Sequence, residues 1–268
     1  MMTSQALRWS LRIGSAITLI FLWVPLGLIG LYAFNDSKSV RWPFSGFTTH
    51  WLSSAIHNQG ARDAFLLSLK VALAAAAVAL LLGTLLAMAV SRFDFFGRNT
   101  VSFIVVLPIA LPGIVTGLAL NQTFVNLFGG LSLLTVIVAH ATFCIVIVYN
   151  NVAARLRRMA GSLEEASSDL GASTWQTFRH VTFPLMRSAI LAGALLAVAL
   201  SFDEIIVTTF TLGATQSQTL PIWIFSNISR PNQLPIVYAV ALIVILLSAI
   251  PVYIAQRLAG DAAGGGRT

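Results

Sequence analysis

One polar stretch decides how this chain is organised: Glu165-Ala166-Ser167-Ser168-Asp169-Leu170-Gly171, followed further on by Val181-Thr182-Phe183-Pro184. It lies between the fourth and fifth of several long apolar segments. An apolar chain that keeps a long, charged and well-capped loop on one side indicates that the loop is offered to a soluble partner. The apolar segments on either side of the loop then indicate what kind of protein the partner acts on.

The composition is that of an integral membrane protein. Of the 268 residues, 57% are hydrophobic and 9% are charged, and the mean hydropathy is +0.86. A soluble globular domain is about 25% charged. The net charge of +7 comes from residues at segment ends, which favours orientation in a lipid bilayer and gives no reason to expect nucleic-acid binding. The single cysteine, Cys144, excludes a disulfide within the chain.

Six apolar stretches reach the length of about 20 residues that a membrane-spanning helix needs. They run roughly over 13–34, 63–90, 101–121, 131–152, 187–210 and 233–256. A lipid-exposed segment satisfies its own backbone only as a helix, so we expect an all-α protein in which residues 1–268 form a single transmembrane domain. The first stretch is longer than the apolar region of a signal peptide, about 7–15 residues, and we interpret it as a retained span.

The basic residues predict the orientation, because positive charge marks the cytoplasmic side. One side collects Arg8, Arg12, Arg92, Arg98, Arg155, Arg157, Arg158, Arg179, Arg187, Arg257 and Arg267. The other side collects Lys38, Arg41, Arg62 and Arg230. We therefore expect both termini and the loop 154–186 to be cytoplasmic.

The third apolar segment contains Leu107-Pro108-Ile109-Ala110-Leu111-Pro112-Gly113. Two prolines and a glycine bend or interrupt a helix. The interruption has two interpretations at this point. It either lines a transport pathway with a broken helix or forms a packing kink, since proline and glycine are common in spanning helices.

The loop has strong start and stop signals. Ser162 with Glu165, and Ser173 with Gln176, each have capping-box spacing, Gly171 suits the left-handed position after a helix, and Pro184 suits a helix start. The pattern predicts helix, glycine turn, helix, proline and spanning helix. Glu165 has a purely local alternative as a cap, and the loop has one as a solvated connection, but long ordered connections are usually functional.

Two acids, Asp203 and Glu204, lie deep in the fifth apolar segment. A charge near the bilayer centre costs about 2.5–3.5 kcal/mol on insertion scales, so such residues normally face a cavity or an ionic partner. Ser201, Glu204, Thr208 and Thr211 have the spacing of one stripe on an unbroken helix. We expect Glu204, with Asp203, Ser201 and Thr208, to line a path for a cationic solute. The alternative is a structural ion pair with Lys70.

His140, in the fourth apolar segment, is expected to make a hydrogen bond between helices. No metal site is expected. An intramembrane serine hydrolase is a further alternative, but the sequence has no Gly-x-Ser-x-Gly motif and gives His140 no obvious serine partner.

ATP hydrolysis is not expected in this chain. The only lysines are Lys38, whose preceding residues lack the glycines of a phosphate-binding loop, and Lys70, which is followed by Val71. We therefore expect no catalytic residue and no cofactor here, with ATP and Mg²⁺ bound by a partner. The main alternative is an autonomous ion-coupled transporter or channel, which needs no such partner.

The loop resembles the "EAA" loop of ABC-importer permeases, whose pattern is E-A-A, three residues, G, nine residues and I-x-L-P. Serine replaces the second alanine, and Val181 and Phe183 replace isoleucine and leucine, but the spacing is intact. The resemblance implies a type I importer fold and a coupling helix over about 162–170 that docks into an ATPase. The motif positions carried over are Glu165, Ala166, Ser167, Asp169, Gly171 and Pro184.

The resemblance extends to permeases of spermidine/putrescine-type importers through Leu107–Gly117, Leu200–Phe210 and Leu220-Pro221-Ile222-Trp223. It implies a subunit of the bacterial inner membrane that forms half of a pathway. It also implies three kinds of partner: a cytoplasmic ATPase dimer, a second homologous permease and a periplasmic binding protein. Putrescine, spermidine and 4-aminobutyrate are all open as substrates.

Overall fold

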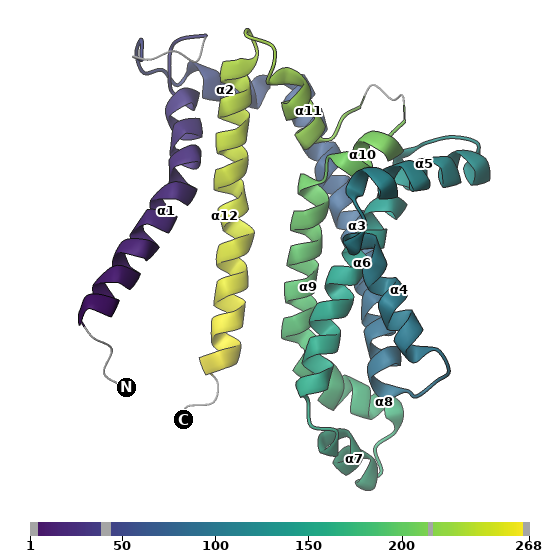
Figure 1. Cartoon of the computed structure of the whole chain (residues 1–268). Helices are drawn as coiled ribbons and strands as arrows, with labels where there is room; N and C mark the ends of the chain where they lie inside the picture. The colour runs from purple at the N-terminus through teal and green to yellow at the C-terminus, as the bar shows by residue number, and fades with distance from the viewer. Residues whose placement is uncertain (1–4, 39–43, 214–216, 265–268) are drawn as a thin grey trace. The chain divides into compact units, whose positions relative to one another are not determined.

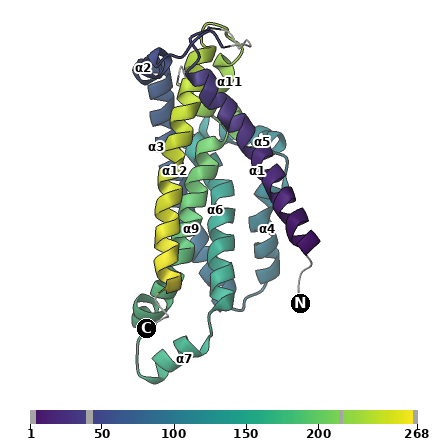
Figure 2. The same cartoon turned by 90° about the vertical axis from the view of Figure 1, so that its left-hand side faces the viewer.

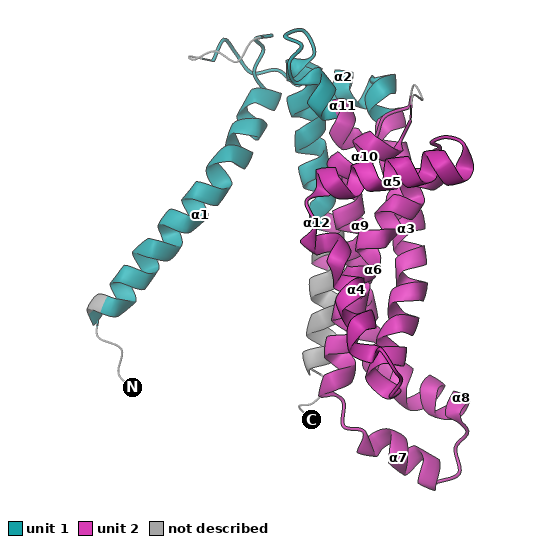
Figure 3. Cartoon of the chain, turned by 45° about the vertical axis from the view of Figure 1, so that its right-hand side comes forward, with its two compact units in different colours: residues 1–62, 224–249 teal, residues 63–223, 250–268 magenta. Residues whose placement is uncertain are grey.

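The structure is a computed structural model that describes residues 5–38, 44–213 and 217–264. Within those ranges the chain is helical and has no strand, only an isolated bridge between Asn35 and Phe47. It divides into two compact units, residues 1–62 with 224–249 and residues 63–223 with 250–268 (Figure 3). Each unit is described by itself.

The first unit contains α1 (Gln5–Ala33), α2 (His50–His57) and the first part of α12 (Leu234–Gly264). Tyr32 near the end of α1 stacks on Tyr238 of α12, with ring centroids 5.4 Å apart. Trp51 of α2 donates its indole N–H to the carbonyl of Asn35 at 2.9 Å. Only 6% of the α1 span is buried, so this apolar helix needs lipid or another protein chain around it.

The second unit contains the helices that position the candidate site. They are α3 (Gln59–Arg92) from residue 63 on, α4 (Arg98–Ala110), α5 (Gly113–Phe128), α6 (Leu133–Arg158), α7 (Ser162–Asp169), α8 (Thr174–Thr177), η1 (Phe178–Thr182), α9 (Phe183–Asp203), α10 (Ile206–Thr211) and the first half of α11 (Leu220–Asn227). Helix α6 is central, because α4, α5, α9 and α10 all pack against it. Figures 1 and 2 both show α6 alongside α9.

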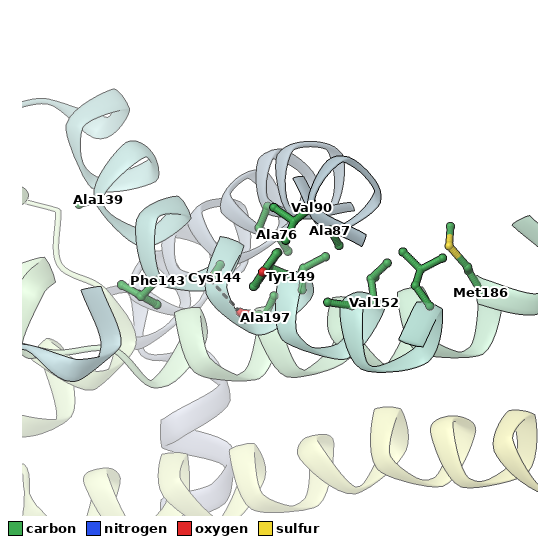
Figure 4. Packing of buried hydrophobic residues seen from close by; sticks show 14 of the residues in the cluster. Ala76, Ala87, Val90, Ala139, Phe143, Cys144, Tyr149, Val152, Met186 and Ala197 are labelled. Atoms are coloured by element: carbon green, nitrogen blue, oxygen red, sulfur yellow. Dashed lines mark hydrogen bonds between the residues drawn. The ribbon is translucent and has the colours of Figure 1, made fainter. Parts of the chain in front are cut away.

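Small residues allow α3 and α9 to approach α6 closely. Val148 of α6 lies between Gly83 of α3 and Gly193 of α9. A Cβ built on Gly83 would be 2.9 Å from the Val148 Cβ, and one built on Gly193 would be 3.3 Å from the Val148 Cα. The surrounding core, which includes Cys144 and Ala197, is shown in Figure 4. Close approach at small residues is typical of helix packing in membranes, where lipid weakens the hydrophobic drive between helices.

Six spans were predicted, and the described helices do not confirm that number. Four helices are long and apolar enough to cross a membrane, and the pair α4–α5 makes a fifth if it counts as one span. The described apolar part of α12, Leu234–Ile250, is shorter than the other spans. The all-α class is confirmed for the described residues.

The third predicted segment is interrupted where its prolines predicted. Helix α4 ends at Ala110, α5 begins at Gly113, and the two axes differ by 106°. Pro112 lies directly before α5 with an extended backbone, and proline has no N–H to donate to the preceding turn. The fifth segment is also interrupted, between Asp203 and Ile206. The prediction of one unbroken helix over 187–210 is therefore wrong.

A larger side chain at Gly83 is expected to separate α3 from α6. The substitution Gly83→Leu should destabilise the protein by about 1–3 kcal/mol, as overpacking does, and lower the temperature at which the purified protein loses its monodisperse state. Gly14→Leu is the control, because a Cβ on Gly14 meets nothing within 4 Å. An unchanged transition temperature for Gly83→Leu would contradict the close packing.

Candidate functional site

The connector, defined here as residues 159–182 between α6 and α9, is ordered and follows the predicted pattern. Helix α7 ends at Asp169 and is followed by Gly171 at a φ of 81°, a left-handed conformation that favours glycine. Ser173 caps α8 by the predicted capping box, donating its N–H to the Gln176 side chain at 2.7 Å. Pro184 lies in the first turn of α9. Figure 2 shows α7 beyond the end of α6.

The other predicted capping box does not form. The N-cap of α7 is Gly161, whose carbonyl accepts from the N–H groups of Glu164 and Glu165 at 3.0 and 3.2 Å. Ser162 is therefore already inside the first helical turn and cannot cap Glu165. The Glu165 carboxylate makes no hydrogen bond or ion pair within the described ranges, and its side chain is exposed.

Glu164 joins the connector to the helix bundle. Its Oε1 atom accepts from Arg92 Nη2 at 2.9 Å and from Thr182 Oγ1 at 2.8 Å. Arg92 is the last residue of α3, and Thr182 directly precedes α9. The two charged side chains are only 23% and 24% exposed, which shields the pair from solvent screening. We call this three-residue contact the Glu164 brace. It ties α7 to the ends of two long helices.

The brace divides α7 into two faces. Glu164 and Ser167 are half-buried, and the Ser167 hydroxyl lies 2.9 Å from that of Thr177. Glu165, Ala166 and Asp169 are exposed. Ser167, which the motif grouped with the docking positions, thus bonds within the connector. The sequence showed no signal that separated Glu164 from Glu165, because only the packing reveals which acid turns inward.

Large apolar side chains are exposed in α7 and in the residues that follow it. Leu163 is 47% exposed, Leu170 is 89% exposed and Trp175 is 64% exposed. Large exposed apolar side chains on a polar segment are typical of a surface that meets another protein or a membrane. The connector therefore presents a mixed acidic and apolar surface.

A cavity of about 410 Å³ lies where α6 ends and α9 begins. Its lining residues are Asn150, Asn151, Ala154, Arg155, Arg158, Ser188 and Ala189. The Arg155 guanidinium also donates to the carbonyl of Leu185 at 2.8 Å. This bond links the end of α6 to the first turn of α9.

The two membrane acids lie at the break between α9 and α10. Asp203 ends α9 and is exposed, whereas Glu204 has an extended backbone and is half-buried. Glu204 Oε1 accepts from the N–H of Val207 at 2.8 Å, so its carboxylate caps the start of α10. Within the described ranges neither acid forms an ion pair with Lys70, which is itself exposed.

The break changes the arrangement of the predicted polar stripe. Ser201 lies on α9, Thr208 and Thr211 lie on α10, and all three are buried. Because the helix is interrupted at Glu204, these residues do not share one face of a continuous rod. The prediction of a single helical stripe is therefore wrong, although its members still lie close to the same interruption.

His140 has the serine partner that the sequence did not reveal. Its Nδ1 atom lies 2.7 Å from Ser201 Oγ, and its Nε2 atom lies 2.8 Å from Thr208 Oγ1. The predicted hydrogen bond between helices is confirmed. His140 is 0% exposed and Ser201 is 3% exposed, so the serine oxygen is not open to a substrate. Among the described residues, no group of three or more His, Cys, Asp or Glu side chains could hold a metal ion.

Loss of the Glu164 charge is expected to loosen α7. In Glu164→Gln the ion pair with Arg92 is lost, and a hydrogen bond to a charged group contributes about 1.5–3 kcal/mol. Amide exchange over residues 162–169 should accelerate on the order of tenfold, as local opening becomes easier. Glu165→Gln is the matched control and should leave exchange unchanged. Equal exchange in both variants would show that the brace does not hold the helix.

Comparison with known proteins identifies the family. The family model for binding-protein-dependent transport system inner membrane components matches residues 79–261. The chain is 35% identical over 245 residues to the putrescine transport system permease protein PotI of Escherichia coli K12, covering 89% of this chain and 86% of that protein. It is 33% identical over 242 residues to the spermidine/putrescine transport system permease protein PotC of the same strain, covering 90% of each.

Solved structures agree on the fold. A bacterial ABC transporter involved in the import of the acidic polysaccharide alginate superposes with a TM-score of 0.72, covering 97% of this chain and 99% of that chain at 17% identity. An amino acid ABC transporter superposes with a TM-score of 0.59, covering 79% of this chain and 98% of that chain at 16% identity. The chain therefore belongs to the family of binding-protein-dependent transport system inner membrane components, the permease subunits of ABC importers.

Proposed function

We propose that this chain forms half of the membrane pathway of an ATP-driven importer for polyamines such as putrescine or spermidine. The observation that carries the proposal is the 35% identity, over 89% of the chain, to a putrescine transport system permease. Two acids at a helix break in the membrane region support a cationic substrate. A 4-aminobutyrate substrate also carries an amine and is a second candidate.

The connector supports a partner that hydrolyses ATP. The exposed acids Glu165 and Asp169, together with the apolar side chains around α7, provide a surface for a soluble protein. The chain has no phosphate-binding loop of its own. ATP and Mg²⁺ would therefore be bound by a separate ATPase dimer, in contact with α7. In this arrangement the chain lies in a bacterial inner membrane, and the connector and both termini are on its cytoplasmic side.

The Glu164 brace gives a route for movement. A partner that displaces α7 pulls on Arg92 at the end of α3 and on Thr182 at the start of α9. Because α3 and α9 both pack on α6 through small residues, a shift at their ends passes along closely packed helices. A periplasmic binding protein would deliver the solute, and a second homologous permease would complete the pathway.

The helix break supplies the negative charge that a cationic solute needs. The C-terminal end of α9 carries the negative end of its dipole, and Asp203 and Glu204 add two carboxylates at the same place. We assign substrate contact to these two acids. Ser201 and Thr208 are buried and hydrogen-bonded to His140, and through these bonds they stabilise the break.

An autonomous ion-coupled transporter is the second candidate function. It would take up its solute with no ATPase present and would not need the outward surface of α7. Family membership favours the importer. Uptake by the purified chain alone in proteoliposomes separates the two candidates, since the importer predicts none.

Charge reversal on the outward face of α7 is expected to weaken the contact with the ATPase. Glu165→Lys should lower the amount of ATPase that co-purifies with the permease at least severalfold, because like-charge or unpaired groups at an interface are costly. Asp36→Lys makes the same charge change at an exposed acid outside the connector and should leave co-purification unchanged. Full ATPase recovery with Glu165→Lys would place the docking surface elsewhere.

Neutralising Glu204 is expected to weaken transport of a cationic solute. In Glu204→Gln the amide oxygen can still accept from the Val207 N–H, so the cap of α10 is retained while the charge is lost. The KM for putrescine uptake into proteoliposomes with the ATPase and the binding protein should rise about tenfold, equivalent to about 1.4 kcal/mol. Unchanged uptake in a normally assembled complex would reject a substrate contact for Glu204.

A further inference from the structure

The break between α9 and α10 is not caused by a proline or a glycine. Ser201-Phe202-Asp203-Glu204-Ile205-Ile206-Val207-Thr208 contains neither proline nor glycine. Glu204 nevertheless has an extended backbone, with φ −72° and ψ 123°. A break in a membrane helix leaves backbone groups without helical partners, which is costly in lipid. The Glu204 carboxylate satisfies the Val207 N–H locally, and contacts with neighbouring helices hold the two sides of the break.

Side chains satisfy the carbonyl groups that follow the break. The Asn121 side chain donates to the carbonyl of Phe210 at 2.6 Å, and the Thr135 hydroxyl donates to that of Thr211 at 2.9 Å. These contacts fix the far end of α10. They do not touch α9, so they do not determine how α10 is placed relative to it.

His140 is bonded to both sides of the break at once. Ser201 lies in the last turn of α9, and Thr208 lies in α10. In an unbroken helix two residues seven positions apart are separated by about 10.5 Å along the axis. His140 bonds Ser201 Oγ at 2.7 Å and Thr208 Oγ1 at 2.8 Å. The ring and its two hydrogen bonds together reach less far than that axial separation. The double contact therefore favours the interrupted helix.

The hydrogen bonds fit one neutral tautomer of His140. Thr208 Oγ1 donates its proton to the Glu204 carbonyl at 2.8 Å, so it accepts from an N–H at His140 Nε2. Nδ1 then carries no proton and accepts from the Ser201 hydroxyl. One neutral tautomer satisfies every group, and the buried imidazole needs no charge.

We propose that His140 is a positioning residue that holds the break between α9 and α10 and thereby places Glu204 against a cationic solute. Its ring fixes Ser201 before the break and Thr208 after it, and Thr208 in turn holds the carbonyl of Glu204 itself. The placement of Glu204 rests on the proposed import function. The double hydrogen bond of His140 to Ser201 and Thr208, which we call the clamp, does not rest on that function. The clamp and the placement of Glu204 are tested separately.

The chain offers a matched control on the same helix. Cys144 lies one turn further along α6, is also buried, and directs its Sγ at the carbonyl of Ala197 at 3.4 Å (Figure 4). Its hydrogen bond goes to α9. Cys144→Ala removes this buried polar contact between α6 and α9 and keeps the hydrogen bonds of His140 to Ser201 and Thr208.

The clamp is tested by a distance across the break. Spin labels at Leu196 and Thr209, both exposed, are attached in the Cys144→Ala background, and the complete importer is placed in nanodiscs. In His140→Ala the distance distribution should broaden and shift toward the separation of an unbroken helix, about 20 Å along the axis for thirteen residues. The control background should keep one narrow distribution. Identical label-distance distributions in the control background and in His140→Ala would overturn the clamp.

The positioning role is tested by a double-mutant cycle on the KM for putrescine uptake. His140→Ala should raise the KM about tenfold in the native background, and add less than twofold when Glu204 is already Gln. Independent, multiplicative effects would overturn the positioning role and leave His140 a packing residue. If Glu204→Gln alone has no effect, the substrate contact of Glu204 fails, while the distance measurement still decides the clamp.

Two conservative variants keep the test decisive if His140→Ala does not assemble. His140→Asn places an amide near the Nδ1 position, and His140→Gln places one near the Nε2 position. Each is expected to keep one of the two hydrogen bonds and to give an intermediate KM. A wild-type KM and a wild-type label distance in both variants would overturn the proposal, because a single bond would then suffice.

Discussion

The carboxylate of Glu164 is the contact on which the arrangement of this permease depends. It accepts from Arg92 at the end of α3 and from Thr182 at the start of α9, so one side chain joins the connector to two long helices. Among the described residues, the other side-chain hydrogen bond that joins α7 to the rest of the connector is between the hydroxyls of Ser167 and Thr177. The proposed contact with an ATPase requires that the surface of α7 is firmly joined to the helices that move, and the brace meets that requirement.

At the other end of α9, one side chain again joins two helical segments. There α9 is interrupted without proline or glycine, and the buried imidazole of His140 bonds on both sides of the interruption. The acids Asp203 and Glu204 lie at the resulting helix end. The brace and the clamp act on opposite ends of α9, which runs from Phe183 to Asp203. In the proposed function, movement applied at the connector would reach the acids through this one continuous helix.

Most features with a local cause were predicted from the sequence, apart from the Ser162–Glu165 capping box, which does not form, and those with a tertiary cause were missed. Gly171, Pro184 and the Ser173–Gln176 box are local signals, and each has its predicted conformation. The interruption near Pro112 is local as well. The break at Glu204 and the inward turn of Glu164 depend on residues distant in sequence, such as His140 and Arg92. No periodicity within one helix reveals them, and for the same reason Ser201 was not recognised as the partner of His140.

The most direct measurement of the central claim is the number of solute molecules imported per ATP hydrolysed by the reconstituted importer when the charges of the brace are exchanged. Arg92→Glu and Glu164→Arg each place like charges together and should lower this ratio at least fivefold while ATP hydrolysis continues. The double variant restores an attractive pair, and we expect it to recover most of the native ratio. A ratio that is native in both single variants, or that stays low in the double variant despite normal assembly, would contradict the claim that Glu164 and Arg92 transmit movement.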